Sequence, residues 1–167
     1  MAEQKALRLN ENKIKYSTIH PICYRFLKQY SDDIFLKGLE AFCRVGTVGA
    51  EKYDAISVRM NYGLGGKPAL EYLDSAARHL VEIAKGIYVD PETTQRHLHH
   101  VLWNVLVFAS FSEAGLCQPL DVPLHLKTNT PADYSEMDFL DIILDISTHD
   151  VSDGDLRSLI HDIIIEC

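Results

Sequence analysis

The amino-acid sequence predicts an all-α protein, a compact helical bundle with an additional C-terminal segment. Its 167 residues are 47% hydrophobic and 24% charged, a size and composition that suit one compact domain with a hydrophobic core. Apolar residues recur at helical spacing along most of the chain, and turn-forming residues separate the runs. We expect residues 1–16 to form a flexible N-terminal arm, residues 17–117 a helical domain, and residues 118–167 a C-terminal extension that is also helical.

Two helices are predicted in the N-terminal part of the domain. Apolar residues at short helical intervals indicate the first helix between Ile19 and Tyr30. Ser31, which two aspartates follow, is a suitable N-cap for a second helix that continues through Val45. The segment 60–68 holds three glycines and a proline within six positions, so we expect a loop there.

The clearest amphipathic helix is predicted over residues 69–85, where one side of the helical period is apolar and the other mostly polar or charged. Gly86 is expected to end it. The short link that follows places Asp90 or Thr93 as the cap of the next helix, with Pro91 near its first position. Helices joined by so short a link tend to pack antiparallel.

The C-terminal extension is less regular. Residues 118–131 read as a loop or a short strand. Ser135 with Asp138 resembles a capping box at the start of one helix, and Asp153 precedes another. Both runs are rich in β-branched residues, so strands remain an alternative for them.

The net charge limits the partners of the protein. There are 24 acidic and 16 basic residues, a formal charge of −8, which repels nucleic-acid backbones and anionic membranes. We therefore expect neither as a partner. A protein of this charge that handles a nucleoside triphosphate needs a bound cation or a local cluster of lysine and arginine.

The cysteines and the first residues indicate a cellular compartment. Four cysteines without CxxC spacing are expected to be reduced thiols. The first residues lack the apolar core of a signal peptide, and no apolar run is long enough for a membrane span. We expect a cytoplasmic protein, in the host cytoplasm if a phage encodes it.

The helix expected to begin near Pro91 carries an unusual polar stripe. His97, His100 and Asn104 stand at positions i, i+3 and i+7, on one narrow line of an otherwise apolar helix. Buried polar groups without partners cost about 1–3 kcal/mol each, so we interpret the stripe as facing something polar inside the protein. Two imidazoles at this spacing can bind one cation, or a phosphate when they are charged.

The preceding helix can supply the other half of a site. His79 borders its polar face, Asp74 and Arg78 lie on that face, and antiparallel packing would bring its edge against the stripe. Asp90 and Glu92 add carboxylates nearby. A mixture of imidazole and carboxylate suits Mn²⁺, Fe²⁺, Co²⁺ or Zn²⁺ better than Mg²⁺, which prefers oxygen ligands.

Other prominent residues are interpreted as structural. A single buried histidine is more often hydrogen-bonded within the core than a ligand. This interpretation is given to His20, His99, His125, His149 and His161. We assign Trp103 to the core rather than to a nucleobase platform, and the glycines at 63–66 match no phosphate-binding loop.

The middle of the sequence contains four short motifs in a fixed order: GAEKYD at 49–54, NY at 61–62, AARHL at 76–80, and KGIYVDPETTQRHLHHVLWNVLVF at 85–108. This series resembles the phage-type dATP/dGTP diphosphohydrolases, the MazZ-like branch related to the MazG-like all-α nucleoside triphosphate pyrophosphohydrolases. In that branch the motifs are G-A-x-K-Y, N-W, R-H-L and D-x-E-x-G-x-x-H-L-x-H-x-x-x-N.

The match has departures at individual positions. Tyr62 stands where the family has tryptophan, and Thr94 stands where it usually has glycine. His97 and His100 stand where the MazG-like enzymes have acids. The metal preference of the MazG-like enzymes therefore does not transfer directly.

The resemblance implies a MazG-like helical bundle, with residues 17–117 as a nucleotide pyrophosphohydrolase domain. It implies hydrolysis of dGTP or dATP to the monophosphate and pyrophosphate with a divalent metal ion (Mn, Co, Zn, Fe or Mg), by a homodimer or homotetramer. By motif match, the metal ligands or phosphate contacts would be His79, His97 and His100. The catalytic acids would be Asp74, Asp90 and Glu92, with the last two as metal ligand or water-positioning base. The nucleotide-binding residues would be Lys52, Tyr53, Asn61, Tyr62, Arg78 and Asn104.

Two other hypotheses remain open. Because histidines replace the usual acids, the protein could keep the pocket without the chemistry and sequester a nucleotide or signalling nucleotide. An HD-like metallophosphohydrolase is the third hypothesis and ranks last. Its adjacent His-Asp dyad is missing from the helical core, since the only such pairs are at 149–150 and 161–162.

Overall fold

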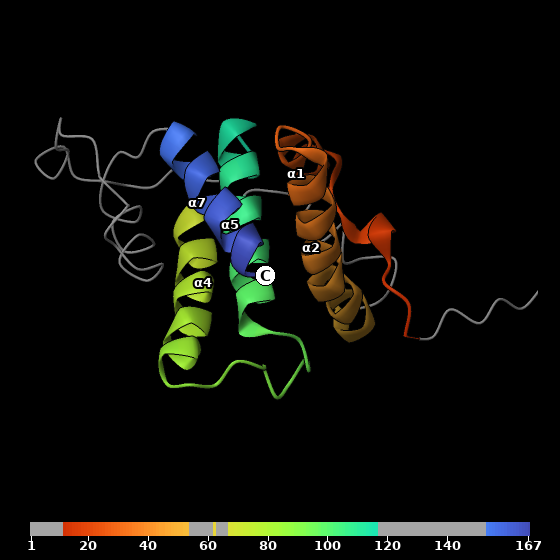
Figure 1. The fold of residues 1–167 in the computed structure, drawn as a ribbon, viewed down its shortest axis with the longest axis vertical. Coiled ribbons are helices and arrows are strands. Elements are labelled where there is room, and N and C mark those ends of the chain that lie inside the picture. Colours follow the sequence, from red (N-terminus) through yellow and green to blue (C-terminus); the bar gives the residue numbers. More distant parts are fainter. Residues whose placement is uncertain (1–11, 54–61, 63–66, 117–152) are drawn as a thin grey trace, which may run out of the picture.

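The computed structural model describes residues 12–53, 62, 67–116 and 153–167. Within these ranges the regular elements are all helices, apart from isolated β-bridge residues, so the prediction of an all-α fold is confirmed (Figure 1). The elements are η1 (Tyr16–Thr18), α1 (Pro21–Leu27), α2 (Asp32–Tyr53), α4 (Ala69–Ala84), α5 (His97–Glu113) and α7 (Asp153–Glu166).

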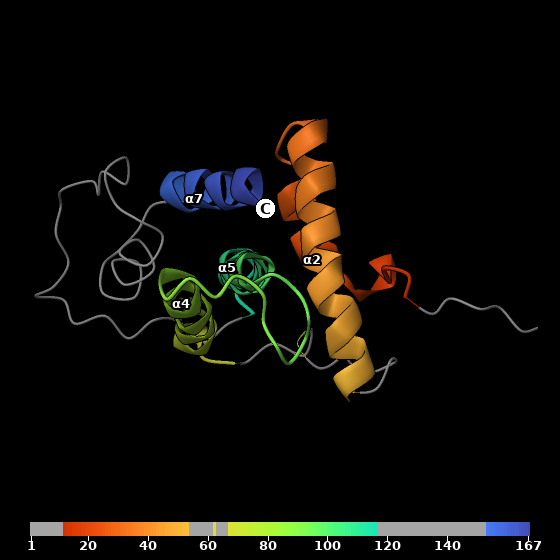
Figure 2. The same cartoon turned by 60° about the horizontal axis from the view of Figure 1, so that its bottom comes forward.

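Helix α5 lies at the centre of the fold. It contacts α1, α2, α4 and α7, and Figures 1 and 2 show it enclosed between α4, α2 and α7. Every residue from His97 to Phe111 is buried except Trp103, which is half-buried. This burial follows from a sequence that is apolar almost all round, since such a helix is stable only when other elements cover each of its sides.

Helices α4 and α5 pack antiparallel, as their short link predicts. Gly86 ends α4 in a Schellman motif: its N–H donates to Ile83 O at 2.9 Å, and the N–H of Ile87 donates to Glu82 O at 3.0 Å. The φ of Gly86 is +82°, a conformation that glycine adopts without strain. The prediction that Gly86 terminates this helix is therefore confirmed.

The link between α4 and α5 is a small hairpin. Val89 and Arg96 form an antiparallel bridge, and the N–H of Asp90 donates to Gln95 O at 2.8 Å. The four residues 91–94 close the loop, a length that is common for hairpins. The chain thus pairs with itself before it enters α5.

This hairpin corrects the prediction for the start of α5. The helix begins at His97, not near Pro91, and its N-cap Arg96 makes no side-chain capping hydrogen bond. Asp90 caps the hairpin loop instead, because its Oδ1 accepts from the N–H of Glu92 at 3.1 Å.

Thr94, at the end of the hairpin loop, has a left-handed backbone with φ of +59°. Its N–H donates to Asp90 O at 2.8 Å, which fixes this conformation. Glycine is the residue that adopts a positive φ without cost. A glycine at position 94 would therefore take up the loop conformation without this strain.

The two N-terminal helices lie where the sequence predicts them, with shifted ends. Helix α1 is shorter than the predicted segment, and His20 caps it by accepting from the N–H of Ile22 at 3.2 Å. Helix α2 carries two aspartates in its first turn and continues to Tyr53, beyond the predicted run to Val45. Before these helices, the N–H of Lys15 donates to the hydroxyl of Thr47 on α2 at 2.8 Å.

Helix α7, the helix expected after Asp153, completes the core against α2 and α5. Its apolar side is buried through Leu159, Ile160, Ile163 and Ile164. Gly38 of α2 gives it room, because a Cβ there would lie 2.9 Å from Cδ1 of Ile164. The helix predicted near Ser135 lies outside the described residues.

Two cations hold the end of α7. Lys37 of α2 donates to Ile165 O at 2.5 Å, and Arg96 donates to Cys167 O and, at 3.4 Å, to Glu166 O. Positive side chains at a helix C-terminus stabilise it through its unpaired carbonyls and its dipole. These contacts tie α7 to both α2 and the start of α5.

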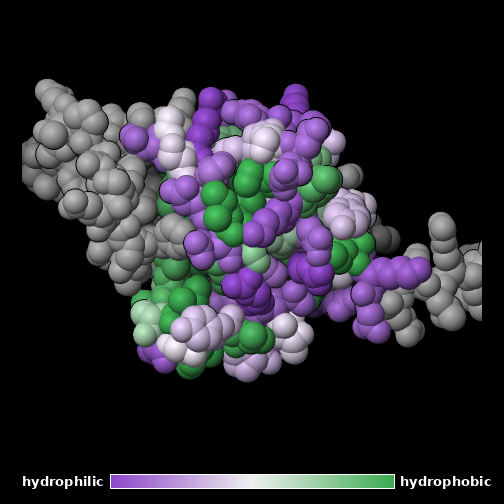
Figure 3. Space-filling model, viewed as in Figure 1, coloured by the Kyte–Doolittle hydropathy of each residue, from purple (hydrophilic) through white to green (hydrophobic). Residues whose placement is uncertain are grey.

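The surface of the described part is mixed in polarity. Exposed apolar side chains gather where α4 meets the link, at Val81, Ile87, Tyr88 and Val89, near the bottom of Figure 3. No described helix is both long and apolar enough to cross a membrane. Of the described cysteines, Cys23 and Cys43 are buried and Cys167 is partly buried, and no disulfide joins any of them to another described residue.

Candidate functional site

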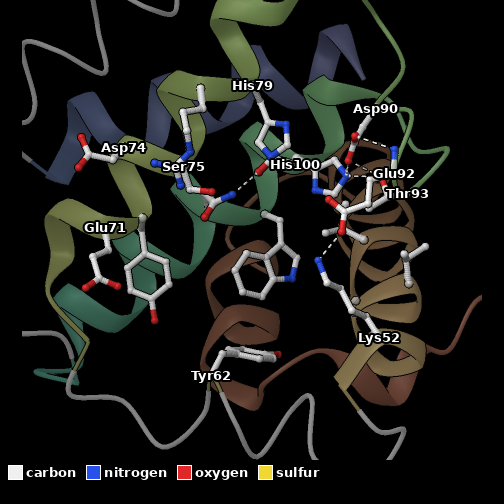
Figure 4. A pocket seen from close by; sticks show the side chains of 18 of the residues that line it. Lys52, Tyr62, Glu71, Asp74, Ser75, His79, Asp90, Glu92, Thr93 and His100 are labelled. Atoms are coloured by element: carbon white, nitrogen blue, oxygen red, sulfur yellow. Dashed lines mark hydrogen bonds and ion pairs between the residues drawn. The ribbon is translucent and has the colours of Figure 1, made fainter.

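A pocket of about 1060 Å³ lies between α2, α4, α5 and the hairpin link (Figure 4). Its α2 wall is built from small and β-branched residues, including Gly46 and Gly49. Gly46 also lets η1 approach α2, because a Cβ at this position would lie 2.4 Å from Oγ1 of Thr18. The small residues of α2 therefore leave space for a ligand and allow η1 to pack closely against this helix.

Most of the residues predicted from the sequence to form a site line this pocket. They are Lys52, Tyr62, Asp74, Arg78, His79, Asp90, Glu92, His100 and Asn104. His97 does not line it but contacts His79. Asn61 and the side chain of Tyr53 lie outside the described residues. Segments far apart in sequence thus bring these groups together.

Three imidazoles meet at the interface of α4 and α5. Nδ1 of His79 lies 2.8 Å from Nδ1 of His97, a hydrogen bond in which one ring donates and the other accepts. The ring of His79 also stacks on that of His100, with centroids 4.4 Å apart and an interplanar angle of 11°. The polar stripe of α5 therefore faces polar partners inside the protein, and two of those contacts come from α4.

These rings do not form a ready metal centre. No group of three or more His, Cys, Asp or Glu side chains within the described residues is arranged to hold a metal ion. The rings of His79 and His100 are nearly parallel, so their in-plane lone pairs do not converge on one point. The three histidines converge mainly on one another, and their role as metal ligands stays a prediction.

The donor types at the pocket nevertheless suit a cation that arrives with phosphates. Mg²⁺-like cations are usually held by one or two carboxylates together with substrate phosphates and water, not by a complete protein cage. Asp90 and Glu92 both line the pocket on the hairpin side and could supply these carboxylates.

Thr93 joins Asp90 to His100. The Thr93 hydroxyl donates to Oδ2 of Asp90 at 2.8 Å and lies 2.8 Å from Nε2 of His100. Nε2 of His100 is also 3.5 Å from Oδ2 of Asp90. The hairpin loop thus presents a carboxylate and a hydroxyl to one edge of a buried imidazole.

The surroundings favour an ionised Asp90 and a neutral His100. Burial, and next the neighbouring His79, lower the pKa of His100 to about 4. For Asp90, burial opposes ionisation, but the hydrogen bonds from Thr93 and from the N–H of Glu92 lower its pKa overall. At neutral pH the site therefore holds a carboxylate beside an uncharged ring.

Three basic side chains line the same pocket, namely Lys52, Lys67 and Arg78. Lys52, near the end of α2, forms an ion pair with Glu92 that bridges α2 and the hairpin. Arg78 on α4 makes no ion pair or hydrogen bond with the described part of the chain. A guanidinium without a partner at a pocket wall is available to an anion.

Asn104 and Trp103 form part of the α5 wall. Asn104 is only 7% exposed, and its Nδ2 donates to His100 O at 2.9 Å. Trp103 stacks on Phe42, with centroids 5.8 Å and planes 15° apart, and lies edge to face with Tyr62. Trp103, interpreted from sequence as a core residue, therefore belongs both to the core and to the pocket.

Sequence reasoning missed several pocket residues. They are Lys67, Glu71, Tyr72, Ser75 and Thr93. A signal for those on and just before α4 was present, because Lys67, Glu71 and Ser75 follow one another at i+4 and Arg78 follows three residues later. Thr93 gave no such signal, since its role depends on the hairpin.

As a whole, the pocket combines cations, carboxylates and imidazoles. The cations can hold a polyanion, and the carboxylates can hold its counter-cation. Carboxylates or imidazoles can also orient a water molecule against the bound anion.

Residues 3–116 match a family model described as dATP/dGTP diphosphohydrolase, N-terminal. The matched range includes α1, α2, α4 and α5, and so the described lining of the pocket, but it ends before α7. Comparisons with curated proteins and with solved structures gave no match.

Proposed function

Because the chain belongs to the dATP/dGTP diphosphohydrolase family through that family's N-terminal domain, we propose that it hydrolyses purine deoxynucleoside triphosphates to the monophosphate and pyrophosphate. The observation that carries this proposal is the pocket within the matched range. It collects the cations Lys52, Lys67 and Arg78 beside carboxylates and imidazoles from three segments of the chain. That set suits a triphosphate accompanied by a divalent cation.

In the proposed reaction, water attacks the α-phosphorus of the nucleotide. A new P–O bond forms, the bond between the α-phosphorus and the bridging oxygen breaks, and pyrophosphate leaves with the bonding electrons. The water proton passes to a basic group or to solvent. A divalent cation, when bound, would neutralise phosphate charge and polarise the P–O bonds.

The residues of the chain divide into those that bind phosphate and those that order the reacting groups. Lys52 and Arg78 hold phosphate oxygens, for which Lys52 exchanges its present partner Glu92 for the substrate. Glu92 and Asp90 then face the cation. Asn104, buried at the pocket wall, orients the nucleotide or a ligand to it.

We further propose that the protein acts as a homodimer or homotetramer. The exposed apolar side chains at the α4 end and the link, including Ile87 and Tyr88, support this because a partner surface would cover them. Light scattering across a concentration series tests it, and a strict monomer would remove it. A cytoplasmic location, expected from the sequence, stays a prediction.

The activity is tested by a panel of nucleotides and metals. The purified chain is incubated with dGTP, dATP, dCTP or ATP and with Mn²⁺, Co²⁺, Zn²⁺, Fe²⁺ or Mg²⁺, and pyrophosphate and phosphate are assayed separately. The proposal expects pyrophosphate from dGTP or dATP, and none after His97→Ala or His100→Ala. His161→Ala is a matched control, because this histidine is exposed on α7 and contacts Asp162.

Other outcomes decide against hydrolysis to pyrophosphate. Tight binding of a nucleotide that is recovered intact would indicate sequestration. Free phosphate as the product would instead indicate a phosphohydrolase of the HD-like kind. An absence of both binding and product across the panel would end the nucleotide interpretation.

A further inference from the structure

Within the described residues, the hydroxyl of Thr93 contacts both Asp90 and His100, so its hydrogen bonds bear on where the proton of His100 lies. A hydroxyl has a single proton. The ionised carboxylate of Asp90 can only accept, so the Thr93 proton points to Oδ2 of Asp90, 2.8 Å away. An O···O contact of this length without a proton between the atoms would be repulsive.

The side of the Thr93 hydroxyl that faces His100 therefore offers a lone pair. Nε2 of His100 lies 2.8 Å from that oxygen and must supply the proton of this hydrogen bond. The ring is buried and stacks face to face on His79, with centroids 4.4 Å apart. A neutral imidazole with a proton on Nε2 has none on Nδ1.

Nδ1 of His100 is then a bare lone pair at the pocket. No hydrogen bond to Nδ1 occurs within the described part of the chain. It is not among the described ring nitrogens that are fully buried without a hydrogen-bond partner, which are Nε2 of His97, Nδ1 of His99 and Nε1 of Trp103. His100 lines the pocket, and Figure 4 shows its ring between the hairpin carboxylates and the pocket interior.

We propose that Thr93 is a positioning residue: held by Asp90, its hydroxyl keeps the proton of His100 on Nε2 and leaves the Nδ1 lone pair of that ring free for the pocket contents. Asp90 orients the hydroxyl and thereby acts on the ring through it. The arrangement resembles the outer-shell hydrogen bonds that fix the tautomer of functional histidines in general. The acceptor at Nδ1 of His100 thus depends on Thr93, a residue of the hairpin loop and not of α5.

The tautomer can be measured without turnover. Long-range proton–nitrogen NMR spectra of histidine-labelled protein, in chelator, report which nitrogen of each ring carries a proton, and His100→Gln assigns the His100 signals. We expect a protonated Nε2 in the wild-type chain and in Thr93→Ser, which keeps the hydroxyl. Thr93→Val keeps the shape but removes the hydroxyl, and we expect a mixture of tautomers.

The rate of pyrophosphate release gives the second readout and is the part that rests on the proposed function. Thr93→Val should lower it about 10–100-fold, the usual effect of losing such a partner, and Thr93→Ser should stay close to wild type. Circular dichroism verifies that each variant is folded. If Thr93→Val does not fold, the wild-type spectrum still decides.

A wild-type proton on Nδ1 of His100 overturns the inference. So does a folded Thr93→Val chain that keeps both the tautomer and the rate of the wild type. A wild-type chain with the expected tautomer and no pyrophosphate release would support the positioning role and count against the proposed hydrolysis alone.

Discussion

Replacing Thr94 by glycine should stabilise the protein. Thr94 has a φ of +59°, and its side chain makes no hydrogen bond with the described residues, so its removal loses no described hydrogen bond. The left-handed region costs an L-residue about 1–2 kcal/mol, and a β-branched one is least comfortable there. Glycine loses about 0.5–1 kcal/mol more conformational entropy on folding. The difference predicts a gain of about 1 kcal/mol in the free energy of unfolding, or about 2–4 °C in melting temperature.

Urea unfolding followed by circular dichroism measures this effect. Thr94→Ala is the first control, because alanine keeps the Cβ and should recover less of the strain than glycine. Gly86→Ala is the reverse control: Gly86 has a φ of +82° and nothing within 4 Å of an added Cβ, so the substitution should cost about 1 kcal/mol through the backbone alone. A Thr94→Gly chain no more stable than wild type, or a neutral Gly86→Ala, would refute the reasoning.

Three further predictions concern the core and the pocket. The folded state lowers the pKa of His100 from 6.5 to about 4, so the unfolded chain binds more protons than the folded chain between these pH values. The stability that this group contributes above pH 6.5 is therefore lost as the pH falls, by on the order of 1 kcal/mol between pH 7 and 5. Urea titrations in chelator measure this pH dependence, and His100→Asn should reduce it. Gly46→Ala should destabilise the chain by about 1–2 kcal/mol in the same assay despite better helix propensity, because the Cβ would lie 2.4 Å from Oγ1 of Thr18. Lys52→Met should change stability by less than about 1 kcal/mol, since its ion pair with Glu92 is exposed, while raising the KM for dGTP in the pyrophosphate assay if Lys52 holds phosphate.

The helices of the protein were predictable from the pattern of apolar residues. A helix that is buried on one side has apolar residues at helical intervals, and a helix that is buried on all sides is apolar nearly throughout. The amphipathic pattern over 69–85 gave α4 nearly to its last residue, and the continuous apolar run gave the buried α5. The hairpin before α5 was missed. Periodicity carries no information on whether a short polar link pairs with itself, and Asp90 and Pro91 fit the start of a helix and the corner of a turn equally well.

Most of the residues that line the pocket and contact one another there were named from the sequence, but their geometry was not predictable from it. A repeated polar anomaly on α5 pointed to His97 and His100, and antiparallel packing pointed to His79. The sequence did not reveal that these rings would bond and stack with one another, because that depends on side-chain rotation within a few ångströms. Thr93 escaped notice for the same reason, since only the folded loop brings it to His100.

The burial of α7 has a practical consequence for protein engineering. The family match stops at residue 116, yet α7 packs against α2 and α5 with its isoleucines buried. Lys37 and Arg96 also donate hydrogen bonds to its final carbonyl groups. The end of the family match and the end of the part of the chain that forms the hydrophobic core are thus different positions. An expression plasmid that encodes only the residues up to 116 would produce a polypeptide in which the apolar surface of α2 and α5 that packs against α7 is exposed to water. Such a surface promotes aggregation.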